Sequence, residues 1–371
     1  MLRFVHLADV HLGRLHAGGL SGEKIAQRRT DTLLTFLQVL TDVAAQSVPL
    51  VLIAGDLFEH QLVDHTTVVE VIQRLAGLPD ITFCVCAGNH DYAAANSPYR
   101  TLAWPANVHL FLADWEQVRL DHLGVTVHGR GFSAPECTEA HLREYQVPEH
   151  GEELQIVLLH ADYPATASRY LPITKTDLHN CTADYVALGH VHNPQILMGD
   201  HLVKAAYSGA LEPLDFGELG EHGYFLGELT KGGAKLQFVP VAARRYHQVL
   251  VSIDGVESMD AVLKAADAAV DAIPDGDMVR LILQGHVSTQ FVLDPARLAS
   301  VGERFFAFDI VNEAHYDADL AQLAAGHSVR AHFIRRLQQQ METDDESARQ
   351  LAHQALLMGL DALAGKEVRW R

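Results

Sequence analysis

Cysteine, long apolar runs and basic side chains are all scarce in this sequence of 371 residues. Its four cysteines are too few for a disulfide scaffold at this length. No segment holds the ~18 uncharged apolar residues of a membrane-spanning helix. The N-terminus also lacks a basic stretch followed by an apolar run. From these shortages we expect a soluble, cytoplasmic protein that does not bind membranes.

The shortage of positive charge is large, since 28 lysines and arginines stand against 47 aspartates and glutamates, for a net charge of −19. Proteins that coat nucleic acid rely on clustered basic residues, so the charge argues against that class. It does not exclude an enzyme that acts on nucleic acid. Bound divalent ions neutralise nearby carboxylates, and a partner subunit can supply a basic surface.

The first half of the chain alternates apolar runs with amphipathic stretches, which is typical of an α/β fold. A helix is expected over 28–45, where apolar residues recur at helical spacing. Further strands after residue 200 predict a second sheet packed against the first. The expected strands are 4–8, 50–54, 82–86, 108–112, 125–128, 155–159, 185–188, 202–207, 224–229 and 235–239.

We predict three domains along the chain. Residues 1–245 contain both sheets and form the largest domain. Residues 246–318 combine two further strands, 248–253 and 278–283, with an alanine-rich helix over 259–273, which indicates a small α+β domain. Residues 319–371 show two apolar stripes at helical spacing and are expected to form a helical hairpin.

Five short polar motifs each follow an apolar strand, and together they offer seven nitrogen and oxygen donors. Each motif alone carries little information. Their order matters, because loops at the carboxyl ends of strands can project several side chains to one point. The motifs are Asp9-Val10-His11, Gly55-Asp56-Leu57-Phe58, Gly88-Asn89-His90-Asp91, His160 and Gly189-His190-Val191-His192.

A mixture of carboxylate, amide and imidazole without cysteine suits manganese, iron or magnesium better than zinc. We therefore expect two divalent metal ions, Mn2+ first and Mg2+ or Fe2+ as alternatives. Two such ions lie ~3.5–4 Å apart, share a bridging carboxylate and activate a water for in-line attack on phosphorus. The reaction expected from this centre is cleavage of a phosphate ester.

The five motifs resemble the pattern D-x-H, G-D, G-N-H-[DE], H and G-H-x-H of the calcineurin-like metallophosphoesterase superfamily, over about residues 1–240. This resemblance implies a four-layer α/β/β/α sandwich, followed here by a small α+β capping domain and a helical tail. It also makes His90 the general acid and Asp91 its orienter. One metal would be held by Asp9, His11, Asp56 and His192, and the other by Asp56, Asn89, His160 and His190.

The flanks of these motifs narrow the resemblance to the DNA repair nuclease branch, of the SbcD/YhaO type. The opening from His6 to Gly13 is similar to the H-x-[AS]-D-x-H-L-G of that branch. Gly55-Asp56-Leu57-Phe58 matches it too and lacks the D-R-G of protein phosphatases. The segments from Tyr207 to Glu218 and from Arg244 to Tyr246 resemble the segments that close its catalytic domain.

This branch implies contacts to DNA, which we assign by position. Arg14, Arg28 and Arg29 are candidates for binding phosphates. Some relatives have a substrate-directed histidine directly after G-D-x-F, whereas this sequence has Glu59 there and His60 one residue later. His60 is therefore the nearest candidate for that role.

The resemblance further implies a DNA phosphodiesterase, exo- or endonucleolytic, that works with an SMC-like coiled-coil ATPase of the SbcC/YhaN type and can form a homodimer. The apolar stripes of the tail fit the ATPase, since an amphipathic hairpin can offer one face to a partner helix, or both stripes pack on the capping domain. Two other functions remain open. They are a phosphoesterase for nucleotides or cyclic dinucleotides, and a non-catalytic subunit of an ATPase repair complex.

Overall fold

The computed structural model describes residues 1–15, 20–148, 151–199, 201–288, 293–317, 323–342 and 346–363. Two six-stranded sheets form the centre of the first part of the chain. The first has the order β12 (Gly233–Pro240), β11 (Gly223–Thr230), β1 (Leu2–Leu7), β2 (Leu50–Ala54), β3 (Thr82–Cys86) and β4 (Val108–Phe111). The second has the order β5 (Glu116–Leu120), β6 (Val125–Arg130), β7 (Leu154–His160), β8 (Tyr185–Gly189), β10 (Ala205–Tyr207) and β9 (Gln195–Met198).

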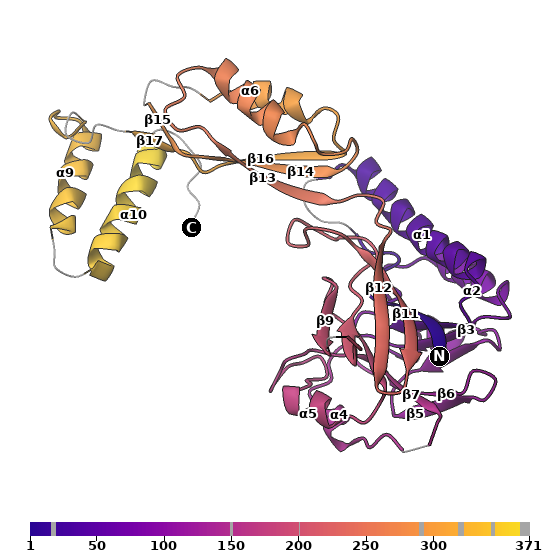
Figure 1. The fold of residues 1–371 in the computed structure, drawn as a ribbon. Coiled ribbons are helices and arrows are strands. Elements are labelled where there is room, and N and C mark those ends of the chain that lie inside the picture. Colours follow the sequence, from indigo (N-terminus) through magenta and orange to yellow (C-terminus); the bar gives the residue numbers. More distant parts are fainter. Residues whose placement is uncertain are drawn as a thin grey trace. The chain divides into compact units, whose positions relative to one another are not determined.

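Helices cover the outer face of each sheet (Figure 1). On the first sheet lie α1 (Gly22–Ala45) and α2 (His65–Ala76), with the short α3 (Pro98–Thr101) nearby in the chain. On the second lie the short helices α4 (His141–Glu144) and α5 (Lys175–Asn180). Apolar cores lie between each sheet and its helices, and another apolar core fills the space between the two sheets. The predicted α/β/β/α sandwich is confirmed.

Parallel pairing brings the ends of several strands to one edge. β1 pairs in parallel with β2 and β2 with β3, while β7 pairs in parallel with β8 in the other sheet. The buried His6 of β1 joins the two sheets near that edge. Its ring nitrogens lie 2.9 Å from the Tyr185 hydroxyl and 3.2 Å from the Leu188 carbonyl. Because a buried polar group must be hydrogen-bonded, this contact fixes how the two sheets align there.

Apolar periodicity did not predict the two edge strands of the second sheet. β5 is mostly exposed and has only two apolar residues, while β9 has only four residues, so neither leaves a clear alternating pattern. Helix α1 begins at Gly22, with the Ser21 side chain accepting from the Lys24 amide, rather than at residue 28. A polar first turn with a serine cap is a helix start that apolar spacing does not reveal.

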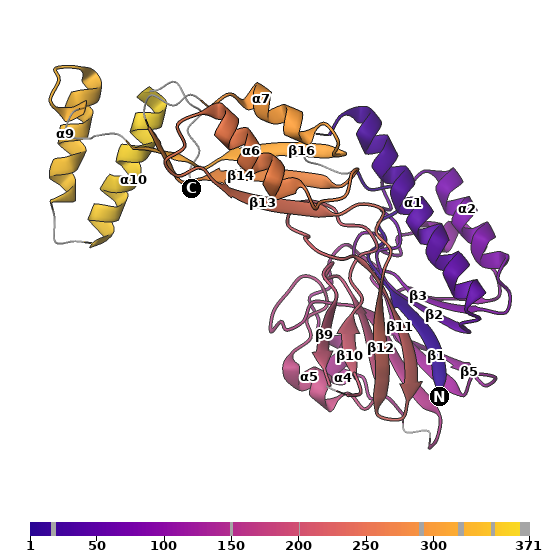
Figure 2. The same cartoon turned by 45° about the horizontal axis from the view of Figure 1, so that its top comes forward.

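The later part of the chain contains a three-stranded sheet in the order β13 (Tyr246–Ser252), β14 (Met278–Gln284), β16 (Ala307–Asn312). Helices α6 (Met259–Val270) and α7 (Pro295–Ala299) lie along one face of it (Figure 2), with a short 3-10 turn at Ser300–Gly302. β15 (His286–Ser288) and β17 (His315–Asp317) pair in parallel. Helices α9 (Val329–Met341) and α10 (Glu346–Leu363) pack on each other through Ile334, Leu337 and Leu356.

By its internal contacts, the chain divides into two compact units. One comprises Met1–Gln248, Ile273–Arg280 and Gly302–Asp309, and the other comprises Val249–Ala272, Leu281–Val301 and Ile310–Arg371. The three-domain division stays a prediction, and residues 319–322, 343–345 and 364–371 of its last domain lie outside the described residues. Within the described part of the chain, no helix is long and apolar enough to cross a membrane.

Arg28, predicted to contact DNA, is fully buried in the sandwich. Its guanidinium donates to the Glu212 carboxylate at 2.8 Å and to the Pro213 carbonyl at 2.9 Å. The same carboxylate accepts from the Thr35 hydroxyl at 2.6 Å. The prediction for Arg28 is wrong, because its guanidinium is engaged in a buried ion pair that joins α1 to the segment after β10.

Removing the Arg28 side chain should destabilise the fold. Arg28→Met would leave the Glu212 carboxylate buried without its cation, which costs about 3–5 kcal/mol of unfolding free energy. The matched control is Arg29→Met, because the Arg29 side chain is 35% exposed and its ion pair with Asp64, at 3.7 Å, lies at the surface. That change should cost less than about 1 kcal/mol. Urea denaturation of both variants measures the difference, and equal losses would contradict the structural role of Arg28.

Candidate metal centre

The seven predicted ligands lie in loops that follow the carboxyl ends of five strands, three from the first sheet and two from the second. Asp9 and His11 follow β1, and Asp56 follows β2. Backbone hydrogen bonds lock these two loops together, from the Asp9 amide to the Gly55 carbonyl and from the His11 amide to the Asp56 carbonyl. Asn89 follows β3, His160 ends β7, and His190 and His192 follow β8.

A first group of donors consists of Asp9, His11 and His192, whose ligand atoms all lie within 4.8 Å of one another. The Nε2 atoms of the two histidines are 3.2 Å apart. Their Nδ1 atoms lie beside the carboxylates of Glu59, at 3.0 Å, and Glu218, at 2.6 Å. A carboxylate only accepts, so each Nδ1 carries a proton and the two Nε2 atoms converge. That convergence fits a cation between them.

A second group consists of Asp9, Asp56 and His160, again within 4.8 Å. His160 Nδ1 lies 3.0 Å from the Ala54 carbonyl, so this nitrogen donates and Nε2 is left as the coordinating atom. His160 Nε2 lies 2.9 Å from Asn89 Oδ1 and 3.3 Å from Asp56 Oδ2. The His190 ring lies 5.2 Å from that of His160, centroid to centroid.

Asp56 lies between the two groups. Its Oδ2 atom is 3.8 Å from His11 Nε2 on one side and 3.3 Å from His160 Nε2 on the other. This is the position that a carboxylate shared by two ions must take. The structure therefore brings the seven predicted ligands close together, with Asp9 in both groups of donors and with Asn89 and His190 beside His160.

The charges in the centre call for a cation. Burial opposes ionisation of Asp56, but the neighbouring His160 and His11 hold the pKa of its carboxyl well below the usual range. Burial alone would lower the pKa of His160, yet the Asp56 carboxylate raises it to about 9. Burial and the charge of His160 lower the pKa of His190 to about 3, so this imidazole is neutral and can coordinate. In the metal-free centre, protons on the imidazoles offset the charge of the carboxylates. Divalent ions could replace these protons and bind the same donors.

The backbone at the ligands is strained. Asp9, His11, Asp56 and His190 have positive φ values of 52°, 53°, 53° and 106°. Such conformations cost roughly 1–3 kcal/mol each and gather at functional sites. Gly88 of the G-N-H-D motif belongs to the same arrangement, since a Cβ there would overlap the Asp56 carboxylate. The motifs therefore use these residues to bring backbone and ligands unusually close.

Asp91 has a different role from the one predicted. Its carboxylate is buried and accepts from four backbone amides and the Tyr99 hydroxyl, the amides being those of Gly88, Asp56, Leu57 and Phe58. These bonds join the loop after β2 to the loop after β3. His90 Nδ1 instead lies 3.1 Å from the Glu59 carboxylate. The orienter of His90 is therefore Glu59, and Asp91 holds the loops in place.

Two carboxylates beside the ligands were missed as site residues. Glu59 contacts both His11 and His90, and Glu218 contacts His192. Burial opposes the ionisation of Glu59, but its hydrogen bonds with His11 and His90 lower its pKa to about 2. From the sequence, Glu59 stands out only as a departure from relatives, and Glu218 only as part of a flanking motif. Their contacts span 48 and 26 residues, a separation that motif spacing does not encode.

Of the other predicted substrate contacts, Arg14 and His60 lie beside the centre. The Arg14 guanidinium pairs with Glu59 at 3.0 Å. Arg29 donates to the Leu62 carbonyl at 3.3 Å. His60 is half-buried, and its amide donates to the His90 carbonyl at 3.2 Å. These placements leave their contact with DNA a prediction.

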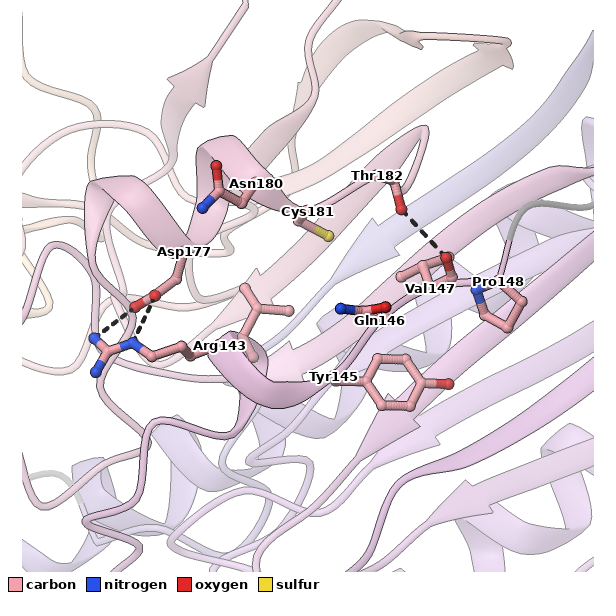
Figure 3. Close-up of a pocket in the computed structure, with 10 residues that line it drawn as sticks. Arg143, Tyr145, Gln146, Val147, Pro148, Asp177, Asn180, Cys181 and Thr182 are labelled. Carbon is pink, nitrogen blue, oxygen red and sulfur yellow. Dashed lines mark hydrogen bonds and ion pairs between the residues drawn. The ribbon is translucent and has the colours of Figure 1, made fainter.

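A separate cavity of about 710 Å3 opens beside α4 and α5 (Figure 3). Gln146, Asn180 and the ion pair of Arg143 with Asp177 line it, together with apolar side chains. None of the predicted site residues is among the lining residues. The convergence of donors, and not the size of a cavity, therefore identifies the candidate centre.

Comparison with known proteins places the same segment in one family. A model of calcineurin-like phosphoesterases matches residues 2–194, more than half of the chain. The metallophosphoesterase YhaO of Bacillus subtilis is 26% identical over 302 residues, which cover 76% of this chain and 72% of YhaO. The match confirms the resemblance that the five motifs indicate.

Two archaeal relatives carry the name DNA double-strand break repair protein Mre11. That of Methanopyrus kandleri is 29% identical over 264 residues, covering 65% of this chain and 57% of the relative. That of Aeropyrum pernix is 28% identical over 281 residues, covering 71% and 66%. The chain thus spans less than two thirds of either Mre11 protein.

Proposed function

Because the chain belongs to the calcineurin-like phosphoesterase family, whose members are metal-dependent hydrolases, we propose that it is a two-metal phosphodiesterase that cleaves DNA. The observation that carries the DNA substrate is the similarity to two proteins named for DNA double-strand break repair. It extends over 65% and 71% of this chain, beyond the five motifs common to the superfamily. The nuclease-type flanks of the first and last motifs support the same substrate.

The donor set supports two divalent ions, with Mn2+ as our first choice. Carboxylate, amide and imidazole donors without cysteine match that class of ion. When bound, the ions would polarise the phosphate and activate a water. Asp56 would serve both ions, and the remaining ligands divide into the groups described above. The Nδ1 contacts of His11, His192 and His160 fix which nitrogen of each ring faces the ions.

His90 is the proposed general acid. Its imidazole is more than a third exposed, and its Nδ1 is held by Glu59. The hydrogen bond with Glu59 raises the pKa of His90 and so stabilises the protonated ring. As the P–O bond to the leaving oxygen breaks, the His90 proton passes to that oxygen. The products are a phosphate monoester end and a hydroxyl end.

Nuclease activity and the role of His90 can be tested together. Protein loaded with Mn2+ should degrade end-labelled single- or double-stranded DNA, and His90→Ala should slow cleavage by ~10²–10⁴-fold because the leaving oxygen loses its proton donor. His65→Ala, which removes an exposed histidine on α2, is the matched control and should cleave at the wild-type rate. Product mapping would give polarity and the preference for ends.

A small-molecule phosphoesterase is the alternative favoured by the net charge of −19. Arg14, the predicted phosphate contact beside the centre, is also already paired with Glu59. A panel of nucleotides and cyclic dinucleotides therefore accompanies the DNA substrates. Intact DNA together with rapid hydrolysis of a nucleotide would overturn the nuclease proposal in favour of this alternative.

We also propose that the α9–α10 hairpin binds an SMC-like coiled-coil ATPase. The hairpin packs its own apolar stripe internally, yet Val329 and Leu351 remain 77% and 62% exposed. Exposed apolar side chains on a helical pair suit a partner helix. Two arginines of the hairpin also make contacts within it, since Arg330 donates to the Leu363 carbonyl and Arg335 to the Gly326 carbonyl.

The partner proposal predicts that Val329→Glu and Leu351→Glu together weaken binding to the SMC-like ATPase of the same organism about tenfold or more, ~1.4 kcal/mol. Both residues are exposed, so the fold should be unchanged. Leu34→Glu, at an equally exposed leucine of α1, is the control. Affinity measured by calorimetry decides, and equal binding by all variants would contradict a role for this surface.

A further inference from the structure

We infer that Glu59 is a positioning residue that couples one metal site to the general acid, through a single carboxylate. The inference rests on the proposed function, because it assigns Glu59 to the ligand His11 and to His90. It goes beyond the seven motif ligands and His90, since Glu59 belongs to none of the five motifs. The juxtaposition of these three side chains carries the argument.

Each oxygen of Glu59 has its own histidine. Oε1 lies 3.0 Å from His11 Nδ1 and accepts from Arg14 Nη1 at 3.0 Å. Oε2 lies 3.1 Å from His90 Nδ1. The two imidazoles meet edge to face, 4.9 Å between centroids. With only 12% of its side chain exposed, Glu59 makes these contacts largely out of water.

The carboxylate sets the tautomer of both rings. Since it only accepts, Nδ1 of His11 and Nδ1 of His90 must both carry a proton. His11 Nε2 is thereby directed toward His192 Nε2 at 3.2 Å and Asp56 Oδ2 at 3.8 Å, where a metal ion would lie. His90 Nε2 becomes the nitrogen that can give a proton to the leaving oxygen. One group therefore prepares a ligand and the acid at once.

The backbone around Glu59 holds the carboxylate in this place. The Glu59 amide donates to the Leu12 carbonyl at 2.9 Å, in the loop of His11. The next amide, of His60, donates to the His90 carbonyl at 3.2 Å. Glu59 is thus fixed to the two loops whose histidines it contacts, so its double contact follows from the backbone and not from a side-chain rotamer alone.

Glu218 offers a matched comparison within the same centre. It is a second carboxylate beside a ligand, 2.6 Å from His192 Nδ1. Its other oxygen accepts from the Leu214 amide at 2.9 Å. No contact to His90 is among its interactions in the described structure. Replacing Glu218 should disturb a ligand alone, whereas replacing Glu59 should disturb a ligand and the acid.

The test compares Glu59→Gln with Glu218→Gln in the full chain. His11 and His90 face different oxygens of Glu59, whereas a glutamine would turn a donating NH2 group toward one of them. We expect Glu59→Gln to weaken Mn2+ binding about 10–100-fold by calorimetry. Long-range 1H–15N spectra of the metal-free protein should show His90 losing its Nδ1–H form. On DNA, kcat should fall more than KM rises, and adding His90→Ala should cost little further activity.

Glu218→Gln should also weaken Mn2+ binding but leave the His90 spectrum unchanged, and its effect on kcat should add to that of His90→Ala. An unchanged His90 spectrum in Glu59→Gln, or identical behaviour of the two variants, would overturn the coupling. Glu59→Ala removes both contacts and serves as the second variant if Glu59→Gln does not fold. The spectra and metal affinities need no DNA, so a failed nuclease assay would leave this test intact.

Discussion

Two buried carboxylates, Asp9 and Asp56, constrain everything around them at the edge where the two sheets end. Each is nearly inaccessible to water, and a buried charge without compensation is expensive. Compensation is supplied by imidazoles from both sheets, and two of them, His11 and His190, have positive φ values. The backbone is thus strained where it brings carboxylates and imidazoles close together. Divalent ions bound between these donors would stabilise this arrangement.

The surrounding contacts divide the work among several carboxylates. The Asp91 carboxylate accepts hydrogen bonds from backbone amides of two loops and so holds Asp56 in place. Glu59 and Glu218 lie one step behind the ligands and determine which ring nitrogens face inward. Acidic residues in this centre are therefore assigned three separable roles, as proposed ligands, as anchors of loops and as orienters of histidine. Part of the large negative charge of the chain is concentrated where it serves a cation.

Much of this centre could be predicted from the sequence, because its ligands directly follow apolar strands. Parallel strands end at the same edge of a sheet, so residues at those ends lie close together, as do Asp56 after β2 and His160 at the end of β7. The partners of Asp91, Glu59 and Arg28 could not be predicted in that way. Arg28 meets Glu212 across 184 residues, and nothing in the local pattern of α1 distinguishes a buried arginine from one available to phosphate. The edge strand β5 was not predicted for a related reason. It is mostly exposed, so its sequence shows little alternation of apolar and polar residues.

The account depends most on two ions sharing Asp56. The direct measurement is the manganese content of the full chain at saturation, combined with electron paramagnetic resonance of the bound ions. The account predicts two Mn2+ ions per chain with a magnetically coupled spectrum, and loss of the coupling in Asp56→Asn. A single ion, or two uncoupled ions whose spectrum is indifferent to Asp56→Asn, would contradict it.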